Sequence, residues 1–233
     1  MIRYARSTPD HIAAQTLTAV PYFAELDPDL LKTVAQAAIR RDYETGQVVF
    51  WAGEPCAGLH VVQQGWFKVI KLSADGREQV LRIVGAGETF AEISVFADKP
   101  NPATVVALEP STALVVRRDA MLQLLDRRPG IARHILQNMA ERVLHLVTLV
   151  EDLSLRTVEA RLARLLLEHA TEGTLHRQRW ATQAEMAARL GTVLVVLNRA
   201  LHSLAAEGLI EVKRRQIKII DQERLEARAM LNE

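Results

Sequence analysis

Three adjacent cations, Lys213, Arg214 and Arg215, form a tight basic cluster near the C-terminal end of the chain. Residues 155–233 contain 13 Lys and Arg against 10 Asp and Glu, whereas residues 1–154 contain 16 against 18. Cations bind the phosphates of nucleic acids mainly through charge. Many domains without that role have a similar excess, so the cluster suggests phosphate contacts but does not decide the function.

Cys56 is the only cysteine, and His60 follows it four residues later. The pair offers two groups that bind metals or respond to redox changes, although a lone cysteine is more often inert. One cysteine excludes an internal disulfide and disfavours an iron–sulfur cluster, which usually takes four protein ligands. The sequence therefore predicts no firm metal site.

Enzyme motifs are absent from the sequence: it has no phosphate-binding glycine loop, no zinc-type His/Cys cluster and no nucleophile elbow. Gly85-Ala86-Gly87 lies between strand-like stretches, so we interpret it as a turn. The N-terminus lacks the apolar stretch of a signal peptide, and no apolar run approaches the ~18 residues that span a bilayer. We expect a cytoplasmic protein that is not an enzyme and does not enter a membrane.

Short Val-, Ile- and Phe-rich runs separated by turn signals fill the middle of the first half, which is typical of an antiparallel barrel or roll. Asp75-Gly76 is a favourable hairpin turn among them. The predicted strands are 48–51, 59–63, 67–72, 79–84, 104–107 and 113–117. A short helical region over 9–40 precedes them.

A long helix is predicted to begin after Pro129-Gly130 and to end near Leu153. Its apolar residues fall into two seven-residue series, which together make a seam that one helix cannot bury alone. The seam residues are Leu136, Met139, Val143, Leu146, Val150 and Leu153. Packing onto the chain's own roll and pairing with a second copy both satisfy this pattern, and we favour the symmetric partner helix.

The last third has the pattern of a winged helix-turn-helix. Thr157 is expected to cap a helix over 158–169, and a strand-like stretch over 175–180 follows. Thr182 and Glu185 form a capping box for a helix over 183–190. Gly191 supplies the turn, and Thr192 is expected to cap a helix over 193–207. Strand-like stretches over 209–212 and 217–220 flank the basic cluster.

These elements predict an α+β fold with three parts. Residues 1–127 form an N-terminal antiparallel β-roll with short helices, which the family resemblance described next implies is the effector-sensing domain. Residues 128–154 form the dimerisation helix, and residues 155–233 form the winged-helix DNA-binding domain.

The chain resembles the Crp/Fnr superfamily of transcription regulators along nearly its whole length. The stretches that carry the resemblance are 49–55 (VFWAGEP), 87–93 (GETFAEI), 158–166 (VEARLARLL), 182–187 (TQAEMA) and 207–210 (EGLI). The resemblance implies a cyclic-nucleotide-binding type of roll, a dimerising helix and a winged helix that regulates promoters. It also implies a palindromic double-stranded operator, a homodimer and RNA polymerase as partners.

The expected effector pocket departs from the members that bind cyclic AMP. Glu92 stands where such members bind the ribose hydroxyl, but Pro102-Ala103 replaces the Arg-Ser pair that binds the phosphate. A buried phosphate needs a cation and hydrogen-bond donors, which neither residue supplies. Leu146 and Val147 stand where such members contact the adenine. We therefore disfavour cyclic AMP and expect a pocket formed by Phe90, Glu92, Ile93, Pro102, Ala103, Leu146 and Val147.

The effector itself stays open between haem or a gas, a redox signal and a small apolar ligand. Residues 98–104 (DKPNPAT) resemble the corresponding loop of dissimilatory nitrate respiration regulators, and an apolar pocket suits haem. The candidate iron ligands, each with an ordinary structural role as the alternative, are His11, His60, His134 and His145.

The expected recognition helix lacks the Arg-Glu pair with which most relatives read bases, since Leu194 and Val195 stand there. One hypothesis is a different operator, read by apolar contact with thymine methyls, by Asn198 on adenine and by Arg199 on guanine. The other is that specific recognition is weakened, so that the protein binds a ligand or a protein partner instead. We favour retained DNA binding, with phosphate contacts from Thr182, Gln183, Thr192, Lys213, Arg214 and Arg215.

Overall fold

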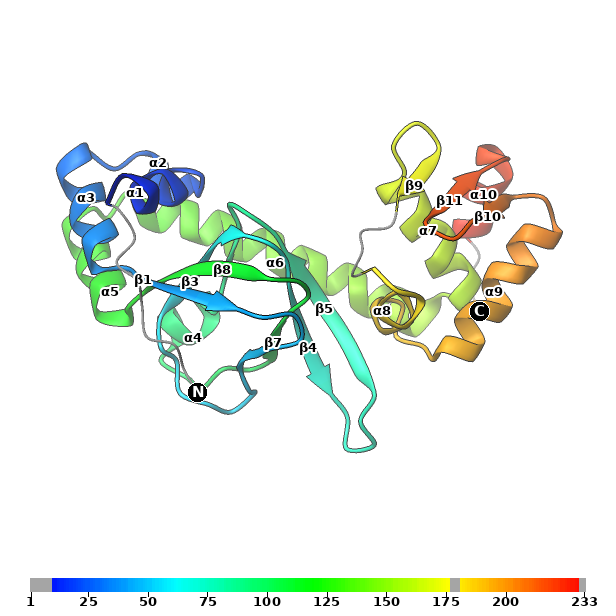
Figure 1. The fold of residues 1–233 in the computed structure, drawn as a ribbon, viewed down its shortest axis with the longest axis horizontal. Coiled ribbons are helices and arrows are strands. Elements are labelled where there is room, and N and C mark those ends of the chain that lie inside the picture. The colour runs from blue at the N-terminus through cyan, green and yellow to red at the C-terminus, as the bar shows by residue number, and fades with distance from the viewer. Residues whose placement is uncertain (1–9, 177–180, 231–233) are drawn as a thin grey trace. The chain divides into compact units, whose positions relative to one another are not determined.

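The computed structural model describes residues 10–176 and 181–230, and the chain divides into two compact units (Figure 1). The roll unit contains Met1–Lys71 and Leu81–Val143, and the C-terminal unit contains Leu72–Val80 and Leu144–Glu233. The division falls within one long helix and at both ends of Leu72–Val80. The three-part division expected from the sequence stays a prediction.

Two four-stranded sheets form the roll, which confirms the predicted α+β fold with an antiparallel β-roll (Figure 1). The first sheet has the order β1-β8-β3-β6 and the second the order β2-β7-β4-β5. The strands of the first sheet are β1 (Ile39–Tyr43), β8 (Ser111–Val116), β3 (Leu59–Gln64) and β6 (Thr89–Phe90). Those of the second are β2 (Val48–Phe50), β7 (Thr104–Ala107), β4 (Phe67–Leu72) and β5 (Glu78–Val84). Every residue of β8 is buried, because this strand pairs with a neighbour on each side and packs on both faces.

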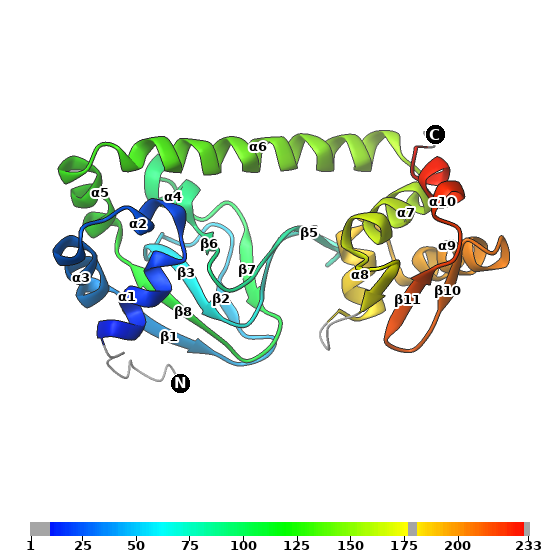
Figure 2. The same cartoon turned by 90° about the horizontal axis from the view of Figure 1, so that it is seen from above.

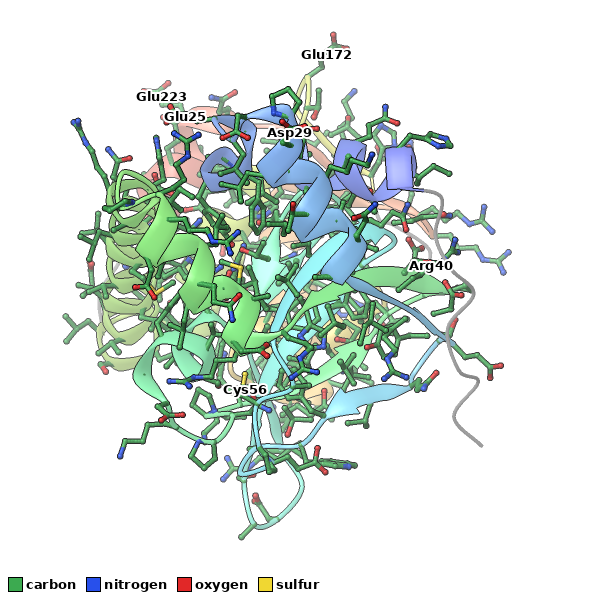
Figure 3. All side chains as sticks on the ribbon, turned by 90° about the vertical axis from the view of Figure 1, so that its left-hand side faces the viewer. Glu25, Asp29, Arg40, Cys56, Glu172 and Glu223 are labelled. Atoms are coloured by element: carbon green, nitrogen blue, oxygen red, sulfur yellow. The ribbon has the colours of Figure 1, made fainter. Side chains whose placement is uncertain are left out.

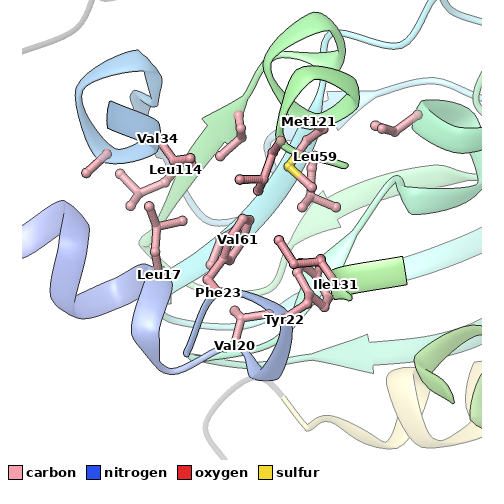
Figure 4. Close-up of a cluster of buried hydrophobic side chains, with 14 of the residues drawn as sticks. Leu17, Val20, Tyr22, Phe23, Val34, Leu59, Val61, Leu114, Met121 and Ile131 are labelled. Carbon is pink, nitrogen blue, oxygen red and sulfur yellow. The ribbon is translucent and has the colours of Figure 1, made fainter. Parts of the chain in front are cut away.

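Helices gather at one end of the roll beside the start of the long helix (Figures 1 and 2). They are α1 (Asp10–Thr18), α2 (Pro21–Ala24), α3 (Pro28–Ala37), α4 (Glu92–Ala97) and α5 (Arg118–Arg127). Pro28 begins α3 with its preset φ, and the Asp27 side chain accepts a hydrogen bond from the Leu30 N–H. The helices bury their apolar faces against β3 and β8, with Phe23, Leu59 and Met121 in the centre of that core (Figure 4).

The long helix α6 (Ile131–Leu155) has the predicted position and length (Figure 2). Its first turns belong to the roll, since Ile131 and Ile135 are buried in the same core as α1 and α5. Pro129 and Gly130 precede it, as expected.

The C-terminal unit is a winged helix-turn-helix with its own core. Its helices are α7 (Val158–His169), α8 (Gln183–Arg189), α9 (Leu194–Ala206) and α10 (Gln222–Ala229). A small sheet of order β10-β11-β9 is formed by β9 (Thr174–His176), β10 (Ile210–Val212) and β11 (Gln216–Ile219). The Thr157 and Thr182 caps are confirmed, since each hydroxyl accepts from the N–H three residues on. Residues 177–180 of the expected strand lie outside the described residues.

The structure corrects several sequence expectations. Thr192 does not cap α9: the cap is Val193, and the Thr192 N–H instead donates to the Ala187 carbonyl. Strand β1 occupies residues assigned in part to the helical region, because Ile39 and Arg40 continue directly from α3. Elements β6, α4, α5 and α10 were not predicted; the strand β6 has only two residues, and α4 begins after Ala91 with a positive φ of 73°.

Candidate nucleic-acid interface and sensor site

The turn between α8 and α9 has the close geometry of a helix-turn-helix. Gly191 adopts a φ of +62°, a conformation that L side chains rarely take. A Cβ added there would overlap the side chain of Leu153. Arg161 on α7 donates to the Leu190 carbonyl at 2.6 Å, which ties this turn to the core of the C-terminal unit. The expected role of Gly191 is confirmed.

Helix α9 presents two different faces. Leu197, Ala200, Leu201 and Leu204 are buried in the core of the C-terminal unit. The opposite face begins with Leu194, which is 43% exposed, and Val195, which is 69% exposed. Asn198 is half-buried and Arg199 exposed, each one turn after an apolar residue. The structure therefore brings all four predicted reading residues of α9 onto one helix face.

The residues expected to contact phosphates lie at three places in the same unit. Lys213, Arg214 and Arg215 are exposed at the turn between β10 and β11, and Lys213 forms an ion pair with Glu211 at 3.0 Å. Thr182 and Gln183 start α8, where Thr182 is exposed although its hydroxyl serves as the cap. Thr192 is half-buried in the turn.

The sensor site contains a buried ion pair that the sequence did not reveal. Glu92, at the start of α4, is 1% exposed, and both of its carboxylate oxygens accept hydrogen bonds from the Arg142 guanidinium on α6. Arg142 also donates to the Thr89 carbonyl at 2.9 Å and lies 3.3 Å from the Thr89 hydroxyl. Burial and the nearby Glu92 charge raise the pKa of the Tyr22 phenol beside them. Arg142 therefore already binds the Glu92 carboxylate, which was expected to bind an effector hydroxyl.

The other expected pocket residues differ in exposure. Phe90 is buried in the roll core and Ala103 is buried, but Ile93 and Pro102 are exposed. The Pro102 carbonyl accepts a hydrogen bond from Lys71 at 2.8 Å, so this loop does have a cation beside it, from β4 and exposed to solvent. Leu146 and Val147 are exposed and belong to the C-terminal unit.

His60 is the one fully buried member of the four candidate iron ligands. It is 3% exposed, stacks on Phe90 with 4.6 Å between ring centroids, and meets Phe50 edge-on. Its Nδ1 donates to the Gly58 carbonyl at 3.0 Å, and burial lowers the pKa of the imidazole to about 4, so the ring is neutral at pH 7. An axial ligand must present a nitrogen to the metal, whereas this ring is packed among aromatic side chains.

The remaining metal candidates come from different elements of the fold. His11 is exposed on α1, His145 is exposed on α6, and His134 lies 3.0 Å from the Glu25 carboxylate. Cys56 lies in the loop between β2 and β3 (Figure 3), and burial raises the pKa of its thiol, which disfavours the reactive thiolate. Among the described residues, no group of three or more His, Cys, Asp or Glu could hold a metal ion.

The predicted seam residues of α6 differ in exposure. Met139 packs against the core of the chain's own roll and is partly buried within one chain. Four exposed apolar side chains of α6 lie on one helix face at spacings of seven, four and three residues. Leu144, which is 66% exposed, is not part of this set. We call this set the α6 row: Leu136, Val143, Val147 and Val150. Val147, expected to contact an effector, therefore belongs to this row, while Leu146 and Leu153 are less exposed.

Comparisons with known proteins agree with this architecture. The family model of the cyclic nucleotide-binding domain matches residues 40–128, and that of the Crp-like helix-turn-helix domain matches residues 160–228. The chain belongs to the Crp/Fnr superfamily of transcription regulators. Over the part of the chain that the structure describes, no helix is long and apolar enough to cross a membrane.

Several individual proteins are similar over most of their length. A CRP-like cAMP-activated global transcriptional regulator of Mycobacterium tuberculosis is 28% identical over 221 residues, 92% of this chain and 99% of the relative. The cyclic AMP receptor protein of Thermus thermophilus is 29% identical over 192 residues, 82% of this chain and 88% of the relative. A solved Crp/Fnr-family structure from Eubacterium rectale shares the fold with a TM-score of 0.73 at 22% identity, covering 91% of this chain and 99% of that one.

Proposed function

We propose that this regulator is a homodimer, not an enzyme, that binds a palindromic DNA site and responds to an effector other than cyclic AMP. The observation that carries the proposal is the α6 row, which is joined through α7 to a helix-turn-helix whose reading face is exposed. Apolar residues at heptad spacing on an exposed helix face gain most by packing against an identical helix. Two chains joined in this way present two α9 helices to one duplex.

The argument against cyclic AMP rests on the Glu92–Arg142 pair. A ribose hydroxyl at Glu92 would have to share a buried carboxylate whose two oxygens already accept hydrogen bonds from a guanidinium. If the hydroxyl displaced Arg142, the carboxylate would lose its cation, which is costly because a hydroxyl carries no charge to replace it. Two relatives are named for cyclic AMP, so whether this chain binds cyclic AMP must be tested directly. Pro102-Ala103 offers a phosphate no side-chain donor, and the nearby Lys71 is exposed, where its charge is screened.

The described histidines do not fit a haem group, because the buried one is packed between Phe50 and Phe90 and the others lie at the surface or beside Glu25. We therefore propose a small ligand that competes for Glu92 or Arg142. When that pair opens, α6 is released from α4, and the change can pass along α6 toward the winged helices. RNA polymerase is the further partner expected of a promoter regulator.

Two measurements test the function. Binding to a selected palindrome and to random DNA at two salt concentrations should differ by about 10³-fold or more in affinity. Calorimetric titration with cyclic AMP should give no saturable heat at millimolar ligand. Saturable binding of cyclic AMP at or below millimolar concentration would contradict the effector proposal.

A second candidate function is favoured by one observation, the exposed apolar pair Leu194 and Val195. A regulator that has lost base reading would use that pair to bind a protein. Equal affinity for all DNA sequences, with a salt dependence set by phosphate contacts alone, would support this candidate over the first.

A further inference from the structure

The start of α9 is an apolar contact surface set among cations. We define the α9 patch as Leu194 and Val195, the two exposed side chains of the first turn. Both are held outward because Leu197, Ala200 and Leu201 anchor the opposite face of the helix in the core. Neither residue can turn inward without removing those three, so the patch is a fixed surface.

The surroundings of the α9 patch favour DNA over a protein as its partner. Arg199 lies one turn after Val195 on the same face, and Lys213, Arg214 and Arg215 are exposed on the wing of the same unit. Cores of protein–protein interfaces are depleted of charge and bury about 800 Å² on each side, which two side chains do not approach. A polyanion with small apolar groups on its surface complements both the charges and the patch.

The major groove of DNA has one such apolar group, the C5-methyl of thymine. We propose that Leu194 and Val195 read thymine methyl groups, so that each half-site contains A·T pairs at the positions under the first turn of α9. Asn198 follows Leu194 by one turn and suits adenine, and Arg199 follows Val195 by one turn and suits guanine. This inference rests on the proposed DNA-binding function and names what the site must contain.

Deoxyuridine provides the test, because it pairs as thymidine does and lacks only the methyl group. The full-length protein is used to select a palindrome from a random duplex pool, and each dT is then replaced singly by dU. Fluorescence anisotropy should show that affinity falls about fourfold when dT is replaced at one contacted position in one half-site, and about fifteenfold when the equivalent position is replaced in both half-sites. All other positions should stay within error.

Variants assign the effect to the patch. In Leu194→Ala and Val195→Ala, replacing dT by dU should no longer change the affinity at the position that each residue contacts. Both side chains are exposed, so the variants should fold as the native chain does, which circular dichroism verifies. Met230→Ala removes an exposed apolar side chain outside α9 and should leave the discrimination intact.

Two negative outcomes are distinct. A selected palindrome that binds specifically but ignores dU at every position overturns methyl reading and leaves the DNA-binding function in place. Failure to select any sequence overturns both, and the apolar patch would then be assigned to a protein partner.

Discussion

The sensor site in the roll and the reading face of α9 differ in whether their functional side chains already have partners. In the roll, the buried Glu92 carboxylate already has a full partner in Arg142. On α9, Leu194 and Val195 are exposed and contribute nothing to the core. A satisfied buried pair changes only when a ligand competes with it, whereas exposed apolar groups gain free energy only when a partner covers them. The difference suggests that the roll is suited to switching and α9 to docking.

Tight DNA binding through α9 depends on two chains acting together, and Val150→Asp should prevent them from pairing. A carboxylate in the α6 row would face its own copy across the dimer, so the chain should become monomeric at micromolar concentration. Affinity for the palindrome should fall about a thousandfold, because one α9 helix then binds without the second. Sedimentation and anisotropy measure the two effects.

Gln137→Asp is the matched control, since it adds the same charge to an exposed position of α6 outside the row. It should leave both the dimer and the affinity unchanged. A monomeric Val150→Asp protein that still binds the palindrome at native affinity would contradict the account.

Arg142→Ala should destabilise the sensor site of the roll, because it leaves the Glu92 carboxylate buried without its cation. We expect a loss of about 3 kcal/mol in the free energy of unfolding of the roll, near the lower end for buried pairs because the Arg142 side chain keeps 18% of its exposure. Urea denaturation measures it. Arg142→Met combined with Glu92→Gln removes both charges and should recover most of the loss. A single variant as stable as the native chain would show that the pair does not hold α6 to the roll.

Two glycine substitutions in the C-terminal unit test whether packing constrains the turn before α9. Gly191→Ala should cost about 2 kcal/mol, from a positive φ and from overlap with Leu153. Gly208→Ala should cost about 1 kcal/mol, because its φ is +73° but no atom lies within 4 Å of the added Cβ. Thermal unfolding compares the two, and equal costs would mean that the close turn before α9 is not constrained by packing.

The roll should also lose stability as the pH falls, through His60. Its folded-state pKa of about 4 lies below the ordinary value of 6.5, so between these values the unfolded chain binds more protons than the folded one. Stability contributed by the neutral ring is complete above pH 6.5 and is lost toward pH 4. We expect a decrease of about 1 kcal/mol from pH 7 to pH 5.5, absent in His60→Leu and retained in the exposed His11→Leu. A His60→Leu variant with the native pH dependence would refute this origin.

Sequence patterns predicted the elements whose signals are local. Thr157, Thr182 and Gly191 mark helix boundaries by residue type alone, and the turn residues placed six of the eight roll strands. The Glu92–Arg142 pair was missed because its partners are 50 residues apart and no spacing rule links the start of one helix to a distant helix. The heptad count placed Met139 in the seam, and it does not distinguish a partner chain from the chain's own roll. Met139 is partly buried against the roll core, and its place in a dimer seam stays a prediction.

Two chains bound to one duplex is the claim on which the rest depends. Sedimentation velocity of the full-length protein with its selected palindrome measures it directly. The account predicts a dimer in the absence of DNA and a complex of two chains with one duplex. A species with one chain per duplex, or single chains at micromolar concentration with and without DNA, would contradict it.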